Sequence, residues 1–269
     1  MEIFADDVVK LVRESEMVLI GIGEEFERKK ILEHDREYCR IIEVVRGEGV
    51  MWAIPYINTL FLSRMQDEIV TALEHLRQMI KGKNYFIVSV CMNGFLQKAG
   101  FKEDRIVEPC GGYSSVQCVD GCQGSVEKTN AGLLAQVEAC CRGEMDWRKL
   151  QAPTCSSCGA PKIFNSLYAD KYLEEGYLQN WAIYMKWLQG TLNRKLCVLE
   201  LGVGLTYPSV IRWPFEKTAY FNKKAVFIRI HENLYQLTEE LKEQGRYVRG
   251  NAVDLLGKED ACCFSDIGQ

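Results

Sequence analysis

The sequence has no long apolar run, no excess of basic residues and no basic cluster in its first seven residues. No part of its 269 residues reaches the roughly 18 to 20 uninterrupted apolar residues that a membrane helix needs. The formal net charge is −4 at pH 7, which argues against general binding to nucleic acid or acidic membranes, since either would need a basic surface. Asp6 and Asp7 replace the basic start of a secretory leader. We therefore expect a cytoplasmic protein without membrane or nucleic-acid partners.

Cysteine, by contrast, is abundant, with 12 residues in the chain. Without an export signal we interpret these residues as reduced thiols. Two pairs have the spacing of metal ligands: Cys118, Cys122, Cys155 and Cys158. Four thiolates close a tetrahedral zinc shell with no open position, so we expect a structural zinc whose binding, on the order of 10–16 kcal/mol, contributes to folding. The adjacent pairs Cys140-Cys141 and Cys262-Cys263 lack this spacing, and we interpret them as incidental thiols.

The hydrophobic pattern alternates between strands and helices. Short apolar runs predict buried strands at residues 17–22, 85–90, 196–201 and 225–230. Helices are predicted at residues 6–16, 60–80, 171–190 and 232–243. This alternation predicts an α/β fold with a Rossmann-like, mainly parallel sheet covered on both faces. Between residues 110 and 165 the apolar periodicity weakens and the thiol pairs appear, which predicts an inserted small zinc-binding domain.

Two of the predicted strands run into glycine turns. Gly21 and Gly23 end the first, and Gly202 and Gly204 follow the strand at 196–201. Ligands of open α/β sheets bind at the carboxyl ends of the strands, so these turns are candidate phosphate contacts. Short glycine turns are common, however, and most only reverse the chain.

Several segments together resemble the sirtuin family. They are residues 84–101, the run Cys110-Gly111-Gly112-Tyr113 ahead of the first thiol pair, and residues 199–204 followed by Thr206 and Pro208. The last stretch and the Cys118-to-Cys122 spacing are most similar to microbial sirtuins linked to macrodomains. The resemblance implies a Rossmann-like large domain of residues 1–109 and 191–269, a zinc-binding small domain with its connecting helix at 110–190, and an NAD cleft between them. It also implies NAD-dependent deacylation of a protein substrate or ADP-ribosyl transfer.

The resemblance assigns cofactor contacts to both glycine turns. Its first loop corresponds to Gly21 and Gly23, and its later loop to Gly202, Gly204 and Thr206. After Gly23, however, this chain has Glu24 and Glu25. These carboxylates would either stand where an anionic pyrophosphate lies and oppose it, or begin a solvated helix that continues to Ile31. On both interpretations NAD binding is weakened.

The catalytic positions that the resemblance implies are also altered. The family's asparagine falls on Cys91, its aspartate on Asn93 and its general-base histidine on Cys110. A thiol cannot reproduce the paired donor and acceptor of an amide. Cys110 could act as a nucleophile or base only if a cation lowered its pKa, and none is near in sequence. A later family asparagine corresponds to Arg229 or His231, where an arginine could hold a phosphate or simply lie at the surface.

Two classes of function follow from this comparison. One is an NAD-dependent enzyme of sirtuin type with impaired or altered activity. The other is a non-catalytic zinc protein with the sirtuin fold that acts as a binding or scaffold component.

Overall fold

A parallel sheet forms the centre of the computed structural model, which describes residues 1–27, 32–64 and 67–258. Its six strands lie in the order β3-β2-β1-β7-β8-β9. Their bounds are Ile106–Val107, Asn84–Ser89, Met17–Ile22, Leu196–Leu201, Val226–His231 and Gly245–Arg249, respectively. Every pairing in this sheet is parallel. The predicted Rossmann-like α/β fold is confirmed.

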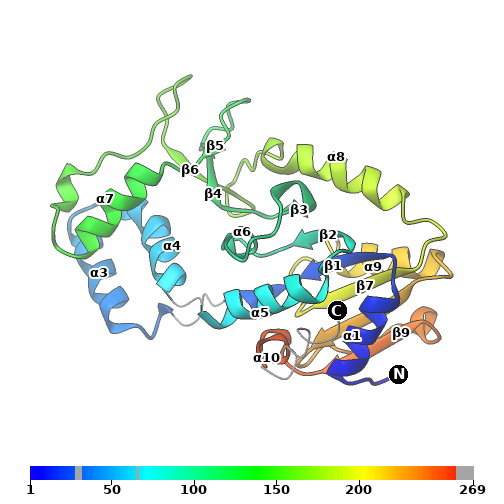
Figure 1. The fold of residues 1–269 in the computed structure, drawn as a ribbon. Coiled ribbons are helices and arrows are strands. Elements are labelled where there is room, and N and C mark those ends of the chain that lie inside the picture. Colours follow the sequence, from blue (N-terminus) through cyan, green and yellow to red (C-terminus); the bar gives the residue numbers. More distant parts are fainter. Residues whose placement is uncertain (28–31, 65–66, 259–269) are drawn as a thin grey trace.

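Helices cover both faces of this sheet (Figure 1). Side chains alternate along β1: Val18, Ile20 and Ile22 join one core, whereas Met17 and Leu19 join the other. The first core also takes residues from α1 (Ala5–Glu14), α5 (Asp67–Met79) and α10 (Ala252–Gly257). The second takes residues from α8 (Glu175–Gln189) and α9 (Arg212–Phe221). Because both faces are covered, the strands are apolar almost throughout.

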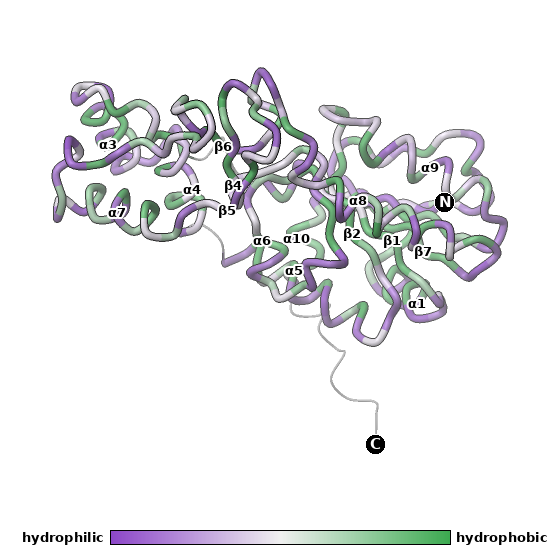
Figure 2. The backbone as a smooth tube through the Cα atoms, turned by 90° about the horizontal axis from the view of Figure 1, so that it is seen from above, coloured by the Kyte–Doolittle hydropathy of each residue, from purple (hydrophilic) through white to green (hydrophobic). Residues whose placement is uncertain are grey.

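A smaller unit extends from the carboxyl edge of the large sheet. It contains a three-stranded antiparallel sheet in the order β5-β4-β6, with bounds Glu127–Lys128, Gly111–Cys118 and Lys162–Ser166. Helix α4 (Ile54–Arg64) contacts both β4 and α7 (Ala131–Cys141), and α3 (Arg36–Gly47) packs on α4. Figure 2 shows α3, α4 and α7 together at one end of the molecule. Residues 36–64 thus join this unit, a contribution that the sequence pattern did not suggest.

Short elements complete the described chain. They are α6 (Phe95–Lys98) and the 3-10 turns η1 (Glu24–Phe26), η2 (Met51–Ala53), η3 (Glu103–Arg105), η4 (Trp147–Lys149) and η5 (Glu239–Leu241). In the part of the chain that the structure describes, no helix is both long and apolar enough to cross a membrane.

The helix expected at 60–80 is found as α4, described as far as Arg64, and α5, described from Asp67, with residues 65–66 outside the described residues. The helix expected at 232–243 is wrong, since only η5 forms there. Two buried arginines explain this difference: Arg212 donates to the carbonyl of Leu234 and Arg229 to that of Gln236, so these carbonyls serve side chains instead of a helix. Of the helix predicted from Glu24, the described residues, which reach Glu27, form only the short turn η1. The rest of that prediction, residues 28–31, lies outside the described residues, as does the pair Cys262-Cys263.

Candidate zinc centre and dinucleotide edge

The four predicted zinc ligands meet in the small unit. The sulfurs of Cys118, Cys122, Cys155 and Cys158 all lie within 4.8 Å of one another. The Sγ atom of Cys158 is 3.5 Å from that of Cys118 and 3.6 Å from that of Cys122. A tetrahedron with Zn–S bonds of about 2.3 Å has sulfurs about 3.8 Å apart, so the cluster has the size of a Zn²⁺ shell. All four ligand positions are sulfur, which leaves no position for substrate.

Two glycines shape the turns that carry these ligands. Gly121 and Gly159 have φ angles of +74° and +75°, a region that favours glycine. Their amides donate to the carbonyls of Cys118 and Cys155, at 3.0 and 2.8 Å, and close the two turns. Backbone amides of Ser157 and Cys158 lower the pKa of Cys155 to about 6, whereas the neighbouring thiols raise the pKa of Cys122 to about 12. Four close thiols therefore ionise together only when a cation offsets their charge.

The two predicted glycine loops lie next to each other at the carboxyl edge of the large sheet, because β1 and β7 are neighbours. A Cβ on Gly23 would lie 2.2 Å from the Cα of Val203, so these loops approach as closely as glycine allows. Gly21 has a different environment. A Cβ there would lie 2.5 Å from Ile211 and 2.9 Å from Phe215, so this glycine lets α9 pack on β1.

Glu24 occupies the amides of the second loop. Its Oε2 accepts from the Gly204 amide at 2.6 Å, and its Oε1 accepts from the Thr206 amide at 3.2 Å. Outward-facing amides that follow a strand are the groups with which this kind of loop binds a phosphate. In this chain a side-chain carboxylate takes both. Glu24 therefore does not begin a solvated helix; its carboxylate lies on the amides of the loop after β7.

Glu25 makes a similar pair of contacts, to one amide just after β8 and one at the start of α10. Its Oε1 accepts from the Glu232 amide at 2.9 Å, and its Oε2 accepts from the Ala252 amide, at the start of α10, at 2.7 Å. The Nδ1 atom of His231 lies 3.2 Å from Oε1. That nitrogen accepts from the amides of Asn233 and Leu234, and burial lowers its pKa, so we treat the ring as neutral and the contact as no ion pair.

Cys91 and Asn93, the two altered positions after β2, bond to backbone carbonyls that follow β1. Cys91 is 4% exposed, and its thiol donates to the carbonyl of Gly23. Burial raises the pKa of this thiol well above its ordinary value, and the Glu27 carboxylate raises it further. The Asn93 side chain donates to the Phe26 carbonyl at 2.8 Å and accepts from the Phe95 amide at 3.1 Å. Both side chains thus hold the η1 turn and the start of α6 in place.

Cys110 lies at 0% exposure among the second core. Its backbone carbonyl accepts from the Leu167 amide, which joins the chain before β4 to the chain after β6. The nearest charged neighbours along the chain do not include the cation that a reactive thiolate requires. The structure therefore places Cys110 in the second core, which also contains Val203 of the loop after β7.

Sequence reasoning missed a group of acids near Cys91. Glu27 accepts from the Met92 amide at 3.0 Å. Glu108 accepts from the Gln97 side chain at 3.0 Å, and burial raises the pKa of Glu108 to about 7. The position of Glu108 two residues before Cys110 was the only available signal, and it indicated neither the burial nor the partner.

Arg229 is neither a surface residue nor a phosphate ligand. Its side chain is 2% exposed, and it donates to Glu200 at 2.5 Å and to Glu216 at 2.6 Å. The Glu200 side chain is fully buried in β7. A buried charge pair of this kind stabilises the structure only when its geometry is satisfied, and here it fixes β8 against β7 and α9.

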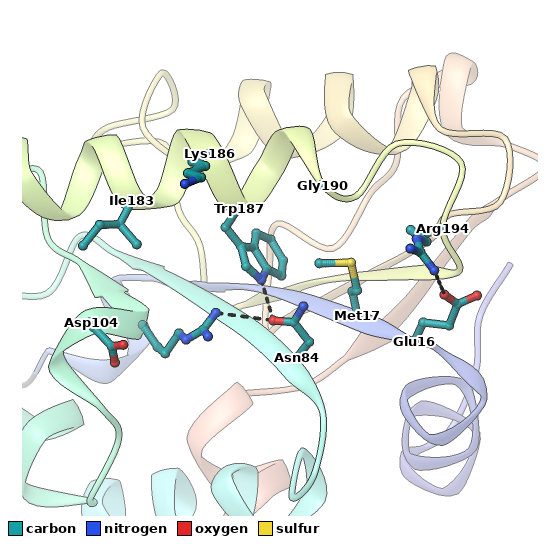
Figure 3. Close-up of a pocket in the computed structure, with 10 residues that line it drawn as sticks. Glu16, Met17, Asn84, Asp104, Ile183, Lys186, Trp187, Gly190 and Arg194 are labelled. Carbon is teal, nitrogen blue, oxygen red and sulfur yellow. Dashed lines mark hydrogen bonds and ion pairs between the residues drawn. The ribbon is translucent and has the colours of Figure 1, made fainter.

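Two of the cavities that described residues line are notable for their size, and both lie away from the glycine loops. One, of about 540 Å³, lies between α4 and the strands β4 and β6 and is largely apolar, with Tyr38, Tyr113 and Phe164 in its wall. The other, of about 590 Å³, lies at the amino ends of β1 and β2 under α8 (Figure 3). In the second, Asn84 accepts from Trp187 at 2.7 Å, and this cavity contains none of the predicted site residues.

Comparison with solved structures identifies the architecture. A complex of Sir2 with a p53 peptide and NAD⁺ has a TM-score of 0.54 at 10% identity, covering 94% of this chain and 96% of that one. A structure from work on the mechanism and regulation of Sir2 enzymes has a TM-score of 0.54 at 13% identity, covering 94% and 93%. The protein has the sirtuin fold. No protein-family model matches the sequence.

Two curated proteins also resemble this sirtuin-fold chain in sequence. A "Protein ADP-ribosyltransferase" of Staphylococcus aureus is 22% identical over 183 residues, which are 67% of this chain and 58% of that protein. A "Probable bifunctional ADP-ribose hydrolase/ADP-ribosyltransferase" of Fusarium oxysporum f. sp. cubense is 27% identical over 141 residues, which are 50% of this chain and 23% of that protein. The chain thus spans less than two thirds of either relative. The resemblance to sirtuins inferred from the sequence is confirmed at the level of the fold.

Proposed function

We propose that this chain is a non-catalytic, zinc-stabilised protein with the sirtuin fold, which acts as a binding component for a protein partner. The observation that carries the proposal is the Glu24 carboxylate on the amides of Gly204 and Thr206. The sirtuin resemblance assigns these two residues to the nucleotide loop. A pyrophosphate would compete with Glu24 for the same donors, and the negative charge of Glu24 would oppose it.

The residues at the catalytic positions support the same proposal. A buried Cys91 thiol with a raised pKa is a poor nucleophile, and it cannot supply an amide's donor and acceptor. The Asn93 amide is already bonded to the backbone. Cys110 is fully buried, so a substrate would reach its thiol only after the core had opened.

The metal in this proposal is structural. Cys118, Cys122, Cys155 and Cys158 would hold Zn²⁺, which fits both their sulfur donors and their spacing. A closed Cys₄ shell supplies folding free energy and no Lewis-acid position. A large and a small domain, with residues 36–64 in the small one, are parts of the same proposal, as are the cytoplasmic location and the protein partner.

A second candidate function is NAD-dependent ADP-ribosyl transfer. It is favoured by the names of the two curated relatives, and it requires that NAD displace Glu24. The two candidates differ in a quantity that can be measured directly, the affinity for NAD.

Calorimetric titration of the zinc-loaded protein with NAD tests the proposal, together with an assay for nicotinamide release. We expect no heat of binding at micromolar NAD and no release of nicotinamide. A micromolar dissociation constant would refute the exclusion of NAD by Glu24, and release of nicotinamide above that of a heat-denatured sample would favour the second candidate instead.

A further inference from the structure

Helix α9 presents an unusual set of side chains to solvent. Trp213 is 55% exposed, Tyr220 is 40% exposed and Phe221 is 73% exposed. The opposite side of the same helix is buried through Phe215 and Ala219, both at 0% exposure. Figure 2 shows α9 at the periphery of the large unit, away from α3, α4 and α7. The described part of the chain therefore covers these three rings only partly.

Lysines alternate with these rings along one side of the helix. At about 100° per residue, Trp213, Lys217, Tyr220 and Phe221 fall within about 100° of the helix circumference. Lys224 follows just after the helix ends, and Lys223 lies over the Tyr220 ring at 4.9 Å. Aromatic rings and cations thus share a single surface.

The chain before β7 extends this surface. The Asn222 side chain donates to the carbonyls of Thr191 and Arg194, at 3.0 and 3.1 Å, and so holds residues 191–195 beside the end of α9. This contact adds Leu192, which is 66% exposed, and the exposed Arg194 and Lys195. We name the combined area the α9 surface; its members are Leu192, Arg194, Lys195, Trp213, Lys217, Tyr220, Phe221, Lys223 and Lys224.

The α9 surface is locally basic although the chain is acidic overall. Arg194 forms an ion pair with Glu16 at 3.2 Å. Within the described part of the chain, Lys195, Lys217 and Lys224 form no ion pair. Acidic residues border one flank, where Gln244 donates to the Ala219 carbonyl and brings the η5 turn alongside. There Glu239 is paired with Lys242. The α9 surface is therefore positively charged, although the net charge of the whole chain is −4.

We propose that the α9 surface binds an anionic lipid bilayer. Tryptophan and tyrosine favour the headgroup region, exposed phenylalanine and leucine gain free energy by leaving water, and lysines are attracted to anionic headgroups. Binding of this kind places α9 flat on the membrane and inserts no helix through it. The inference goes beyond the proposed function and does not depend on whether NAD binds.

Other occupants fit these residues less well. Protein interfaces are depleted in lysine and enriched in arginine, whereas four of the five cations here are lysines. Single-stranded nucleic acid binds in a groove that follows its backbone, whereas this area is the outer surface of a helix. Leu192 and Phe221, the most exposed apolar members, offer no hydrogen bond to either partner. The sequence alone predicted no membrane partner because it gives only the average charge.

Flotation of the zinc-loaded protein with vesicles tests the proposal. We expect it to bind vesicles of equal parts phosphatidylcholine and phosphatidylglycerol, not phosphatidylcholine alone, with binding that falls as salt is raised. The double substitution Lys217→Gln/Lys224→Gln should lower the partition coefficient roughly thirtyfold, because each lysine contributes about 1 kcal/mol near an anionic surface. The substitution Trp213→Ser/Phe221→Ser should lower it by at least about tenfold.

Matched variants elsewhere serve as controls. Lys102→Gln/Lys128→Gln removes two exposed lysines, and Leu178→Ser/Met185→Ser removes two exposed apolar side chains of α8; both should bind vesicles like the unchanged protein. Zinc content and circular dichroism check that each variant folds. The proposal is overturned if anionic vesicles do not bind, or if the α9 variants and the controls behave alike. It is also overturned if the α9 variants instead lose binding to a single-stranded oligonucleotide or lose self-association in sedimentation.

Discussion

Replacing Glu24 with alanine should convert the amides of Gly204 and Thr206 into an anion site. In the unchanged protein these amides make two charge-assisted hydrogen bonds to Glu24, at 2.6 and 3.2 Å. Such bonds contribute about 1.5–3 kcal/mol each, and we take the lower value because Glu24 is partly exposed. An external anion must therefore replace two internal hydrogen bonds that together contribute about 3 kcal/mol, which lowers its affinity roughly a hundredfold.

Pyrophosphate is the simplest probe for this effect, and calorimetric titration measures it directly. We expect Glu24→Ala to bind pyrophosphate at least about a hundredfold more tightly than the unchanged protein. Glu24→Gln, which keeps an acceptor but removes the charge, should lie between the two. Glu240→Ala removes an exposed acid distant in sequence from the loop and should have no effect.

Two outcomes would refute this reasoning. Equal binding of pyrophosphate by Glu24→Ala and the unchanged protein would mean that Glu24 does not block the site. No binding by a folded Glu24→Ala variant would mean that the two amides do not form an anion site at all.

Three further predictions concern stability. Elemental analysis should find about one zinc per chain, and Cys118→Ser should lose both the metal and several degrees of Tm, since a closed thiolate shell contributes to folding. Burial raises the pKa of Glu108 to about 7, above the ordinary value of 4.5, so between these pH values the folded state binds a proton that the unfolded state has lost. The free energy of unfolding should therefore fall as pH rises from 4.5 to 7. In urea titrations Glu108→Gln should lose this pH dependence. Arg229→Met should cost about 3–5 kcal/mol because it leaves Glu200 buried and unpaired, and adding Glu200→Met should restore much of that loss in the same assay.

The sequence predicted the large-scale features that depend on local patterns. The strands at 17–22 and 196–201 are continuous apolar runs, and their glycine turns lie side by side because β1 and β7 pair. The zinc ligands could equally be predicted from the sequence, because their spacing and turn glycines are local in the chain. Features that depend on contacts between distant residues could not be predicted in this way. The apolar period at 232–243 resembles a helix, but it gives no sign that Arg229 and Arg212 capture the carbonyls of that segment.

The carboxyl edge of the large sheet shows the same division between local and distant information. The sequence placed Glu24 and Glu25 after the first glycine turn and allowed two interpretations. Only the fold brings residues 204–206, 232 and 252 to them: Gly204 lies 180 positions from Glu24 in the chain, and Ala252 lies 227 positions from Glu25. Cys110 is likewise buried in a core to which β2, α8 and α9 contribute, and no motif near Cys110 encodes that packing.

Glu24 and Glu25 also change what the carboxyl edge needs for stability. In an open α/β sheet the loops after neighbouring strands usually leave amides free for a ligand. Here the turn after β1 is bonded to the loop after β7 through Glu24, and to the loop after β8 and the start of α10 through Glu25. These contacts connect three strand ends through side chains of the protein itself. A ligand that displaced them would have to replace their bonds before it added stability, so NAD should raise the Tm of this protein little or not at all.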